Sequence, residues 1–83
     1  MVTNYDPDHP APIFDMQAAL IADLVAHYHR PMTSTELHQA TGIPMNTFSN
    51  PWFYRRLEDR YGITRTTHPR SRHRPAIFTP PRP

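Results

Sequence analysis

Apolar residues between Ile13 and His29 recur with the spacing of a helix that buries one broad face. On a wheel of about 100° per residue, polar Gln17 and Asp23 lie opposite this face or at its rim. The pattern predicts an amphipathic helix that ends before Pro31, because a proline disfavours helical backbone in the residue that precedes it. The apolar arc consists of Phe14, Ala18, Leu20, Ile21, Leu24, Val25 and Tyr28.

A second, shorter helix is predicted from about Ser34 to Thr41. Thr33 followed by Glu36 three positions later is the sequence of a capping box, in which each residue satisfies a backbone N–H of the other. Leu37 is expected to face the core. Gly42 suits the position that ends a helix, because glycine adopts left-handed backbone at little cost.

The stretch after Gly42 predicts a short turn of helix at residues 44–49 and a longer helix from Pro51 to about Tyr61. Pro51 would clash inside a continuous helix, whereas proline is well accommodated at the first position of a new one. Asn50 is a good N-cap for that second segment. Gly62 is expected to end it.

Two short strands are predicted at the carboxyl end, over Ile63–Thr67 and Pro75–Thr79, where β-branched and aromatic residues gather. The loop between them is polar and rich in arginine. A two-stranded hairpin is too small to be stable alone, so we expect it to pack on the helices.

This order of elements resembles the winged helix-turn-helix superfamily, with no specific family indicated. The resemblance rests on Thr33-x-x-Glu36-Leu37, Ala40-Thr41-Gly42-Ile43, Phe48, Leu57 and Tyr61-Gly62-Ile63. It implies an α+β fold of three to four helices followed by a two-stranded β-hairpin wing, over residues 13–79. Residues 1–12 are expected to form a flexible Pro-rich arm, and residues 80–83 a disordered tail.

In that superfamily the second helix of the unit usually enters the DNA major groove, and the wing contacts a minor groove or phosphates. Because Pro51 interrupts the unit, either residues 45–50 or the helix from Pro51 takes the recognition role. The resemblance implies DNA contacts by Met45, Asn46, Thr47, Ser49 and Asn50, and by the wing arginines Arg65, Arg70, Arg72 and Arg74.

The charge is distributed unevenly along the 83 residues, whose net charge is +2. Residues 1–29 hold four aspartates and no arginine, a charge of −4, whereas residues 30–83 hold nine arginines and three acids, a charge of +6. Such asymmetry indicates a polyanionic partner for the second half. On the helix from Pro51, Arg55, Arg56 and Arg60 lie near Trp52 and are expected to contact DNA. Trp52 itself is expected to fold onto the wing, or else to stack on a base or anchor a protein.

The composition gives little support to other classes of function. There is no cysteine, the six histidines lack the spacing of a known metal motif, and the two glycines form no phosphate-binding loop. We therefore expect no enzyme activity, no cofactor and no metal. No apolar run approaches the length of a membrane span, and the amino terminus lacks the pattern of a secretory signal, so a cytoplasmic protein is expected.

The sequence therefore predicts a protein that binds double-stranded DNA, as a small transcriptional regulator or a DNA-architectural protein of bacterial or phage type. The alternative is a winged-helix module that binds another protein through Trp52 and the aromatic and arginine residues of its helix. RNA binding by the basic carboxyl-terminal segment is a third interpretation. A homodimer formed through part of the first helix is a further expectation, because small helix-turn-helix proteins often bind palindromes as dimers.

Overall fold

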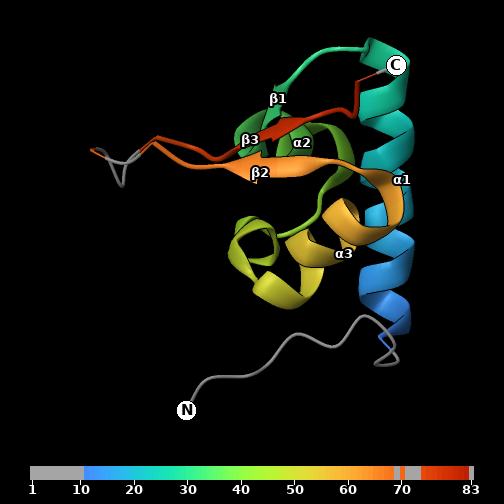
Figure 1. Ribbon diagram of the computed structural model, residues 1–83. Coiled ribbons are helices and arrows are strands. Elements are labelled where there is room, and N and C mark those ends of the chain that lie inside the picture. The colour runs from blue at the N-terminus through green and yellow to red at the C-terminus, as the bar shows by residue number, and fades with distance from the viewer. Residues whose placement is uncertain (1–10, 69, 71–73, 83) are drawn as a thin grey trace.

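The computed structural model describes residues 11–68, 70 and 74–82, which form a small α+β domain (Figure 1). Within these residues, three α-helices and one short 3-10 helix pack against a three-stranded antiparallel sheet. The elements in chain order are α1 (Pro12–Tyr28), β1 (Met32–Thr33), α2 (Ser34–Thr41), the 3-10 helix η1 (Met45–Ser49), α3 (Pro51–Tyr61), β2 (Thr64–Thr66) and β3 (Ile77–Thr79).

The capping box that the sequence predicts is present at the start of α2. The backbone N–H of Glu36 donates to Oγ1 of Thr33 at 3.1 Å, and the backbone N–H of Thr33 donates to Oε1 of Glu36 at 3.0 Å. Gly42 ends the helix with a φ of 76°, in the left-handed region that glycine adopts readily. The predicted second helix is therefore confirmed, with the predicted ends.

The helical backbone is interrupted between η1 and α3, at the position that the Asn50-Pro51 pair predicts. Oδ1 of Asn50 accepts a hydrogen bond from the backbone N–H of Trp52 at 3.0 Å, and Pro51 occupies the first turn of α3. Residues Met45–Ser49 adopt a 3-10 helix rather than continuing into α3. These five residues consequently form a separate ridge beside the longer helix.

The sheet has one strand more than the sequence predicts, so the expectation of a two-stranded wing is wrong. β1, between α1 and α2, pairs with β3, and the strand order is β1-β3-β2. Met32 and Arg65 both lie opposite Phe78 of the central strand. A strand of two residues has no hydrophobic period, which is why the sequence pattern does not reveal it.

The core lies between the sheet and the three helices, and aromatic rings form its centre. Phe48 of η1 makes edge-to-face contacts with Phe53 of α3 and Phe78 of β3, with ring centroids 5.8 and 5.7 Å apart. This cluster ties the ridge at η1 both to α3 and to the sheet. The buried apolar residues are Ala18, Ile21, Val25, Met32, Leu37, Ile43, Phe48, Phe53, Leu57, Ile63, Ala76 and Phe78.

The apolar arc of α1 is only partly buried. Ala18, Ile21 and Val25 face the core, but Leu20 is 49 % exposed and Tyr28 is 51 % exposed. The sequence pattern overestimates the buried arc because α1 runs along one side of the domain, where only one stripe meets other elements (Figure 1). Dimerisation through the exposed part of this helix stays a prediction.

The described part of the chain departs from the predicted boundaries at the amino end. Pro12, expected in the arm, is the first residue of α1. The rest of the predicted arm, apart from Ala11, lies outside the described residues, as does Pro83 of the predicted tail. Across residues 11–68, 70 and 74–82, none of the helices has both the length and the apolar character needed to cross a bilayer.

Candidate nucleic-acid interface

A groove of about 650 Å³ runs between the helical ridge at η1 and the β2–β3 hairpin. One wall consists of the start of α2 and of η1, and the other consists of Arg65 of β2 and the described residues between β2 and β3. We call this the basic groove. The described residues that line it are Ser34, Thr35, Met45, Asn46, Phe48, Ser49, Arg65, Thr67, His68, Arg74, Pro75 and Ala76.

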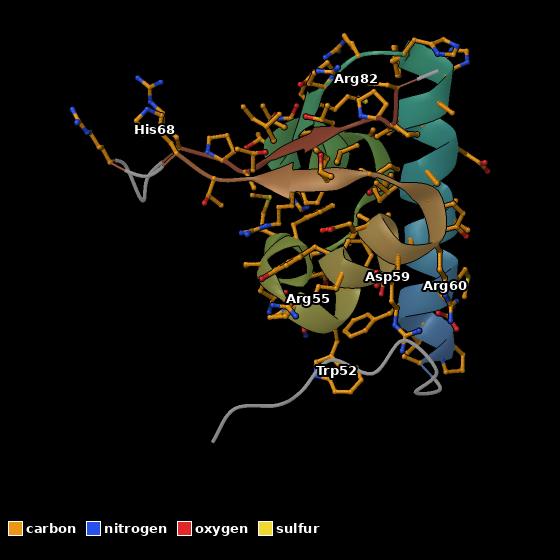
Figure 2. All side chains as sticks on the ribbon, viewed as in Figure 1. Trp52, Arg55, Asp59, Arg60, His68 and Arg82 are labelled. Atoms are coloured by element: carbon orange, nitrogen blue, oxygen red, sulfur yellow. The ribbon has the colours of Figure 1, made fainter. Side chains whose placement is uncertain are left out.

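The hairpin wall of the basic groove carries its positive charge. Arg65 enters from β2, whereas His68 and Arg74 belong to the segment that joins the strands. Figure 2 shows His68 projecting well beyond the helices, so this wall stands out from the body of the domain. The imidazole Nδ1 of His68 accepts a hydrogen bond from the backbone N–H of Arg70 at 3.2 Å. Arg70 is therefore held near the outer end of the same wall.

None of the described residues that line the basic groove is acidic. The carboxylates of the described chain lie elsewhere: Asp15 bonds Arg56 and Arg60, and Glu36 bonds Arg30. No described carboxylate forms an ion pair with Arg65 or Arg74. The positive charge of the basic groove is therefore not neutralised by these groups, and the groove attracts anions.

The Arg30–Glu36 pair lies on another part of the surface, near the end of α1. Nη2 of Arg30 lies 2.8 Å from Oε2 of Glu36. The hydrogen bond from Arg30, followed by the backbone N–H of Thr33, lowers the pKa of Glu36 from its usual 4.5 to about 2. This carboxylate thus accepts the capping hydrogen bond of α2 and neutralises the charge of Arg30. Neither group therefore contributes unpaired charge to the basic groove.

The structure brings together five of the residues that the sequence predicts to bind DNA. Met45, Asn46 and Ser49 of η1 are exposed and line one wall, and Arg65 and Arg74 line the other. The hydroxyl of Ser49 donates to the backbone carbonyl of Asn46 at 3.3 Å. An amide, a hydroxyl and two guanidiniums in one groove are suited to bind phosphate oxygens and base edges.

Two residues of the predicted recognition segment, Thr47 and Asn50, do not present an exposed side chain to a ligand. Thr47 is buried rather than exposed, because the 3-10 helix turns Thr47 and Phe48 toward the core, and this burial argues against the predicted DNA contact. Asn50 is half-buried, and its side-chain oxygen caps α3. The sequence pattern treats this segment as one helical face, whereas the break at Pro51 gives η1 its own orientation.

The side chain of Arg56 is completely buried, which argues against its predicted contact with DNA. Its Nη1 lies 2.9 Å from Oδ1 of Asp15, and Nη1 of Arg60 lies 2.8 Å from the same oxygen. Figure 2 shows Arg60 on the side of α3 that faces α1. These two arginines join α3 to α1, and the single negative charge of Asp15 offsets part of theirs.

Trp52 and Arg55 lie apart from the basic groove. Figure 2 shows Trp52 at the end of α3 that points away from the sheet, so the expectation that it folds onto the hairpin is wrong. Trp52 is half-buried, and Arg55 is exposed beside Glu58 and Asp59. The outer face of α3 is consequently mixed in charge rather than basic.

The structure describes two of the three remaining wing arginines. Arg70 and Arg74 are exposed, as their polar surroundings predict. Arg72 lies outside the described residues, so its predicted contact is not addressed by the structure. Arg74 lines the hairpin wall, and Arg70 lies next to His68 near its outer end, so both long side chains can reach a ligand seated in the basic groove.

Four residues at this site are not identified by the sequence pattern as a group. Ser34 and Thr35 begin α2, Thr67 follows β2, and Tyr54 lies under the guanidinium of Arg65. Cζ of Arg65 is 4.5 Å from the centroid of the Tyr54 ring. Only the fold brings these residues together, because Tyr54 and Arg65 belong to different elements and no local motif links them.

The described residues contain no group of three or more histidine, cysteine, aspartate or glutamate side chains arranged to hold a metal ion. Comparisons of the chain with protein-family models, curated proteins and solved structures gave no match. The geometry and charge of the basic groove are therefore the basis for the function proposed below.

Proposed function

We propose that this protein is a small winged helix-turn-helix protein that binds double-stranded DNA through the basic groove. The observation that carries the proposal is a groove lined by Arg65, His68 and Arg74 and by no described acid. Polyanion binding by clustered arginine is the general basis of affinity for DNA. Transcriptional regulation or an architectural role in a bacterial or phage setting would follow from such binding.

The shape of the groove supports a duplex as the ligand. A wall at η1 and a wall at the hairpin stand on either side of one concave channel. A DNA backbone strand is a convex, negatively charged ridge between the major and minor grooves. With that strand in the channel, Asn46 and Ser49 of η1 would face one DNA groove, and the hairpin would face the other.

A titration of labelled duplex DNA at several salt concentrations tests the proposal. Each phosphate that the protein neutralises makes the negative slope of log affinity against log salt steeper by about 0.9. Arg65, Arg70 and Arg74 together predict a slope of about −3 or steeper. The variant with Arg70→Ala and Arg74→Ala should bind more weakly and show a slope that is shallower by about 2.

A matched control removes the same amount of charge from other surfaces. Arg55 and Arg82 are both exposed, and Figure 2 shows them away from His68 and the end of the hairpin. The variant with Arg55→Ala and Arg82→Ala should keep the salt slope of the unaltered protein. If the unaltered protein shows no salt-dependent duplex binding at about 50 mM salt, the DNA proposal is wrong.

A second candidate function is binding to another protein through the end of α3. The separation of Trp52 from the hairpin favours it, because a DNA surface that extended over α3 would need a continuous positive face (Figure 2). Instead, Arg56 and Arg60 are joined to Asp15, and Glu58 and Asp59 lie beside Arg55. Loss of a partner on Trp52→Ala, with duplex binding absent, would support this function over the first.

A further inference from the structure

Arg65 is held in an unusual environment at the inner side of the basic groove. Its guanidinium lies over the ring of Tyr54, with Cζ 4.5 Å from the ring centroid. Its Nε is buried, and no described residue accepts a hydrogen bond from it. The charged group is therefore fixed by stacking rather than by an ion pair, and it retains hydrogen-bonding capacity.

The two ends of this stack are both anchored in the core. Arg65 lies opposite Phe78 in the sheet, so the stem of its side chain begins on the face that covers the core. Tyr54 is half-buried and packs against the core from α3. Because both anchors are fixed, the guanidinium has little freedom to leave the groove.

A second arginine–tyrosine stack in the same protein provides a contrast. Cζ of Arg30 lies 5.5 Å from the ring centroid of Tyr28, but Arg30 also bonds Glu36 at 2.8 Å. That pair is exposed and its charge is compensated. Arg65, by comparison, has a stacking partner and no described carboxylate, which leaves its charge directed to the groove.

We propose that Tyr54 is a positioning residue that holds Arg65 as a preformed contact for a phosphodiester of the DNA strand seated in the basic groove. This inference rests on the proposed function. A planar guanidinium presents parallel N–H groups that match two phosphate oxygens, and an arginine that is already ordered loses less conformational entropy on binding. A concave channel admits the convex backbone of a duplex, whereas the flat base edges lie at the bottom of its grooves.

Variants at Tyr54 test the stack separately from the charge. Tyr54→Leu removes the ring but leaves every arginine in place, so duplex affinity should fall by roughly tenfold while the salt slope stays unchanged. The loss should be similar for all DNA sequences, since phosphate contacts do not read bases. Tyr54→Phe keeps the ring and should restore the affinity of the unaltered protein.

Variants at Arg65 complete the test. Arg65→Lys keeps the charge but loses the planar fork, so it should weaken binding like Tyr54→Leu without changing the salt slope. Arg65→Gln removes the charge and should make the slope shallower by about 0.9. If Tyr54→Leu fails to fold, Tyr54→Met takes its place, because it also removes the ring while keeping an apolar side chain of adaptable shape.

The control is Tyr28→Leu, which disrupts the compensated stack and should leave duplex binding unchanged. If the unaltered protein binds duplex DNA and both Tyr54→Leu and Arg65→Lys bind it equally well, this inference is overturned and the proposed function stands. A loss confined to certain DNA sequences would also overturn it, because Arg65 would then read a base. No duplex binding by the unaltered protein would overturn both.

Discussion

Arg56 and Asp15 lie 41 residues apart in the chain and join α3 to α1 through a contact of 2.9 Å between Nη1 and Oδ1. The Arg56 side chain is completely buried, whereas that of Asp15 is 36 % exposed. Arg60 donates to the same carboxylate oxygen at 2.8 Å. One aspartate thus serves two arginines at the junction of the two helices.

This junction predicts that Asp15→Asn destabilises the domain. The substitution keeps the shape of the side chain but removes the negative charge beside a buried guanidinium. Because Asp15 is partly exposed, we expect a loss of about 2 kcal/mol in the free energy of unfolding, below the usual 3–5 kcal/mol for a fully buried pair. Urea denaturation followed by circular dichroism measures this difference.

Arg60→Gln is the comparison for that experiment. The Arg60 side chain is 42 % exposed, so its pair with Asp15 should contribute no more than about 1 kcal/mol. Equal, small effects of Asp15→Asn and Arg60→Gln would mean that the buried charge of Arg56 does not depend on Asp15.

The start of α2 gives a second prediction about stability. Thr33→Ala removes the hydroxyl that accepts the backbone N–H of Glu36 and should cost about 1 kcal/mol. Leu37→Ala should cost roughly 2–5 kcal/mol, because Leu37 is fully buried and the change leaves a cavity. Thermal denaturation should rank the two in this order, and the reverse order would contradict the packing of α2.

The Glu36 carboxylate predicts a dependence of stability on pH. Its pKa is about 2 in the folded protein and near the usual 4.5 when the chain is unfolded, because the hydrogen bonds from Arg30 and Thr33 are then absent. The folded pKa is the lower one, so the stabilisation is complete above pH 4.5. It is lost as the pH falls from 4.5 through about 2.

Glu36→Gln isolates this effect, since glutamine also fits a capping box but carries no charge. The difference in unfolding free energy between the unaltered protein and this variant should shrink as the pH falls from 4.5 to about 2. Arg30→Gln removes the largest cause of the lowered pKa and should flatten most of the same profile. A difference that stays constant with pH would contradict the assignment.

Local sequence signals predict the parts of this fold that depend on neighbouring residues. Thr33 with Glu36, and Asn50 with Pro51, set helix ends within a few positions, so their geometry follows from the sequence. The strand β1 is different, because two residues pair with β3 only after the chain has folded back. Local pattern cannot indicate such a pairing.

The same limit applies to the candidate site. A helical wheel gives the angle between Arg55 and Arg56 but does not say which of them faces α1, and the burial of Arg56 depends on distant Asp15. Thr47 is likewise turned inward by a 3-10 geometry that the wheel does not describe. The exposure of Arg74, by contrast, follows from the polar composition of its loop, because no core pairing is needed to place it.

The ridge at η1 gives the last prediction, which concerns selectivity among DNA sequences. Asn46 is exposed on the wall of the basic groove, and an asparagine amide can donate to and accept from adenine in the major groove. Asn46→Ala should therefore reduce the discrimination between the preferred site and other sites by about 1–3 kcal/mol, the usual contribution of one bidentate contact. Selection from a randomised duplex library, followed by titration of selected and unselected duplexes, measures this discrimination.

Thr47 provides the matched control for Asn46, because it is the next residue of the same 3-10 helix and is buried. Thr47→Ala should lower thermal stability and leave the order of preferred sites unchanged. The variant with Arg70→Ala and Arg74→Ala should weaken all duplexes alike, because phosphate contacts position the protein without reading sequence. A change of site preference on Thr47→Ala, with none on Asn46→Ala, would mean that η1 does not present its exposed face to the bases.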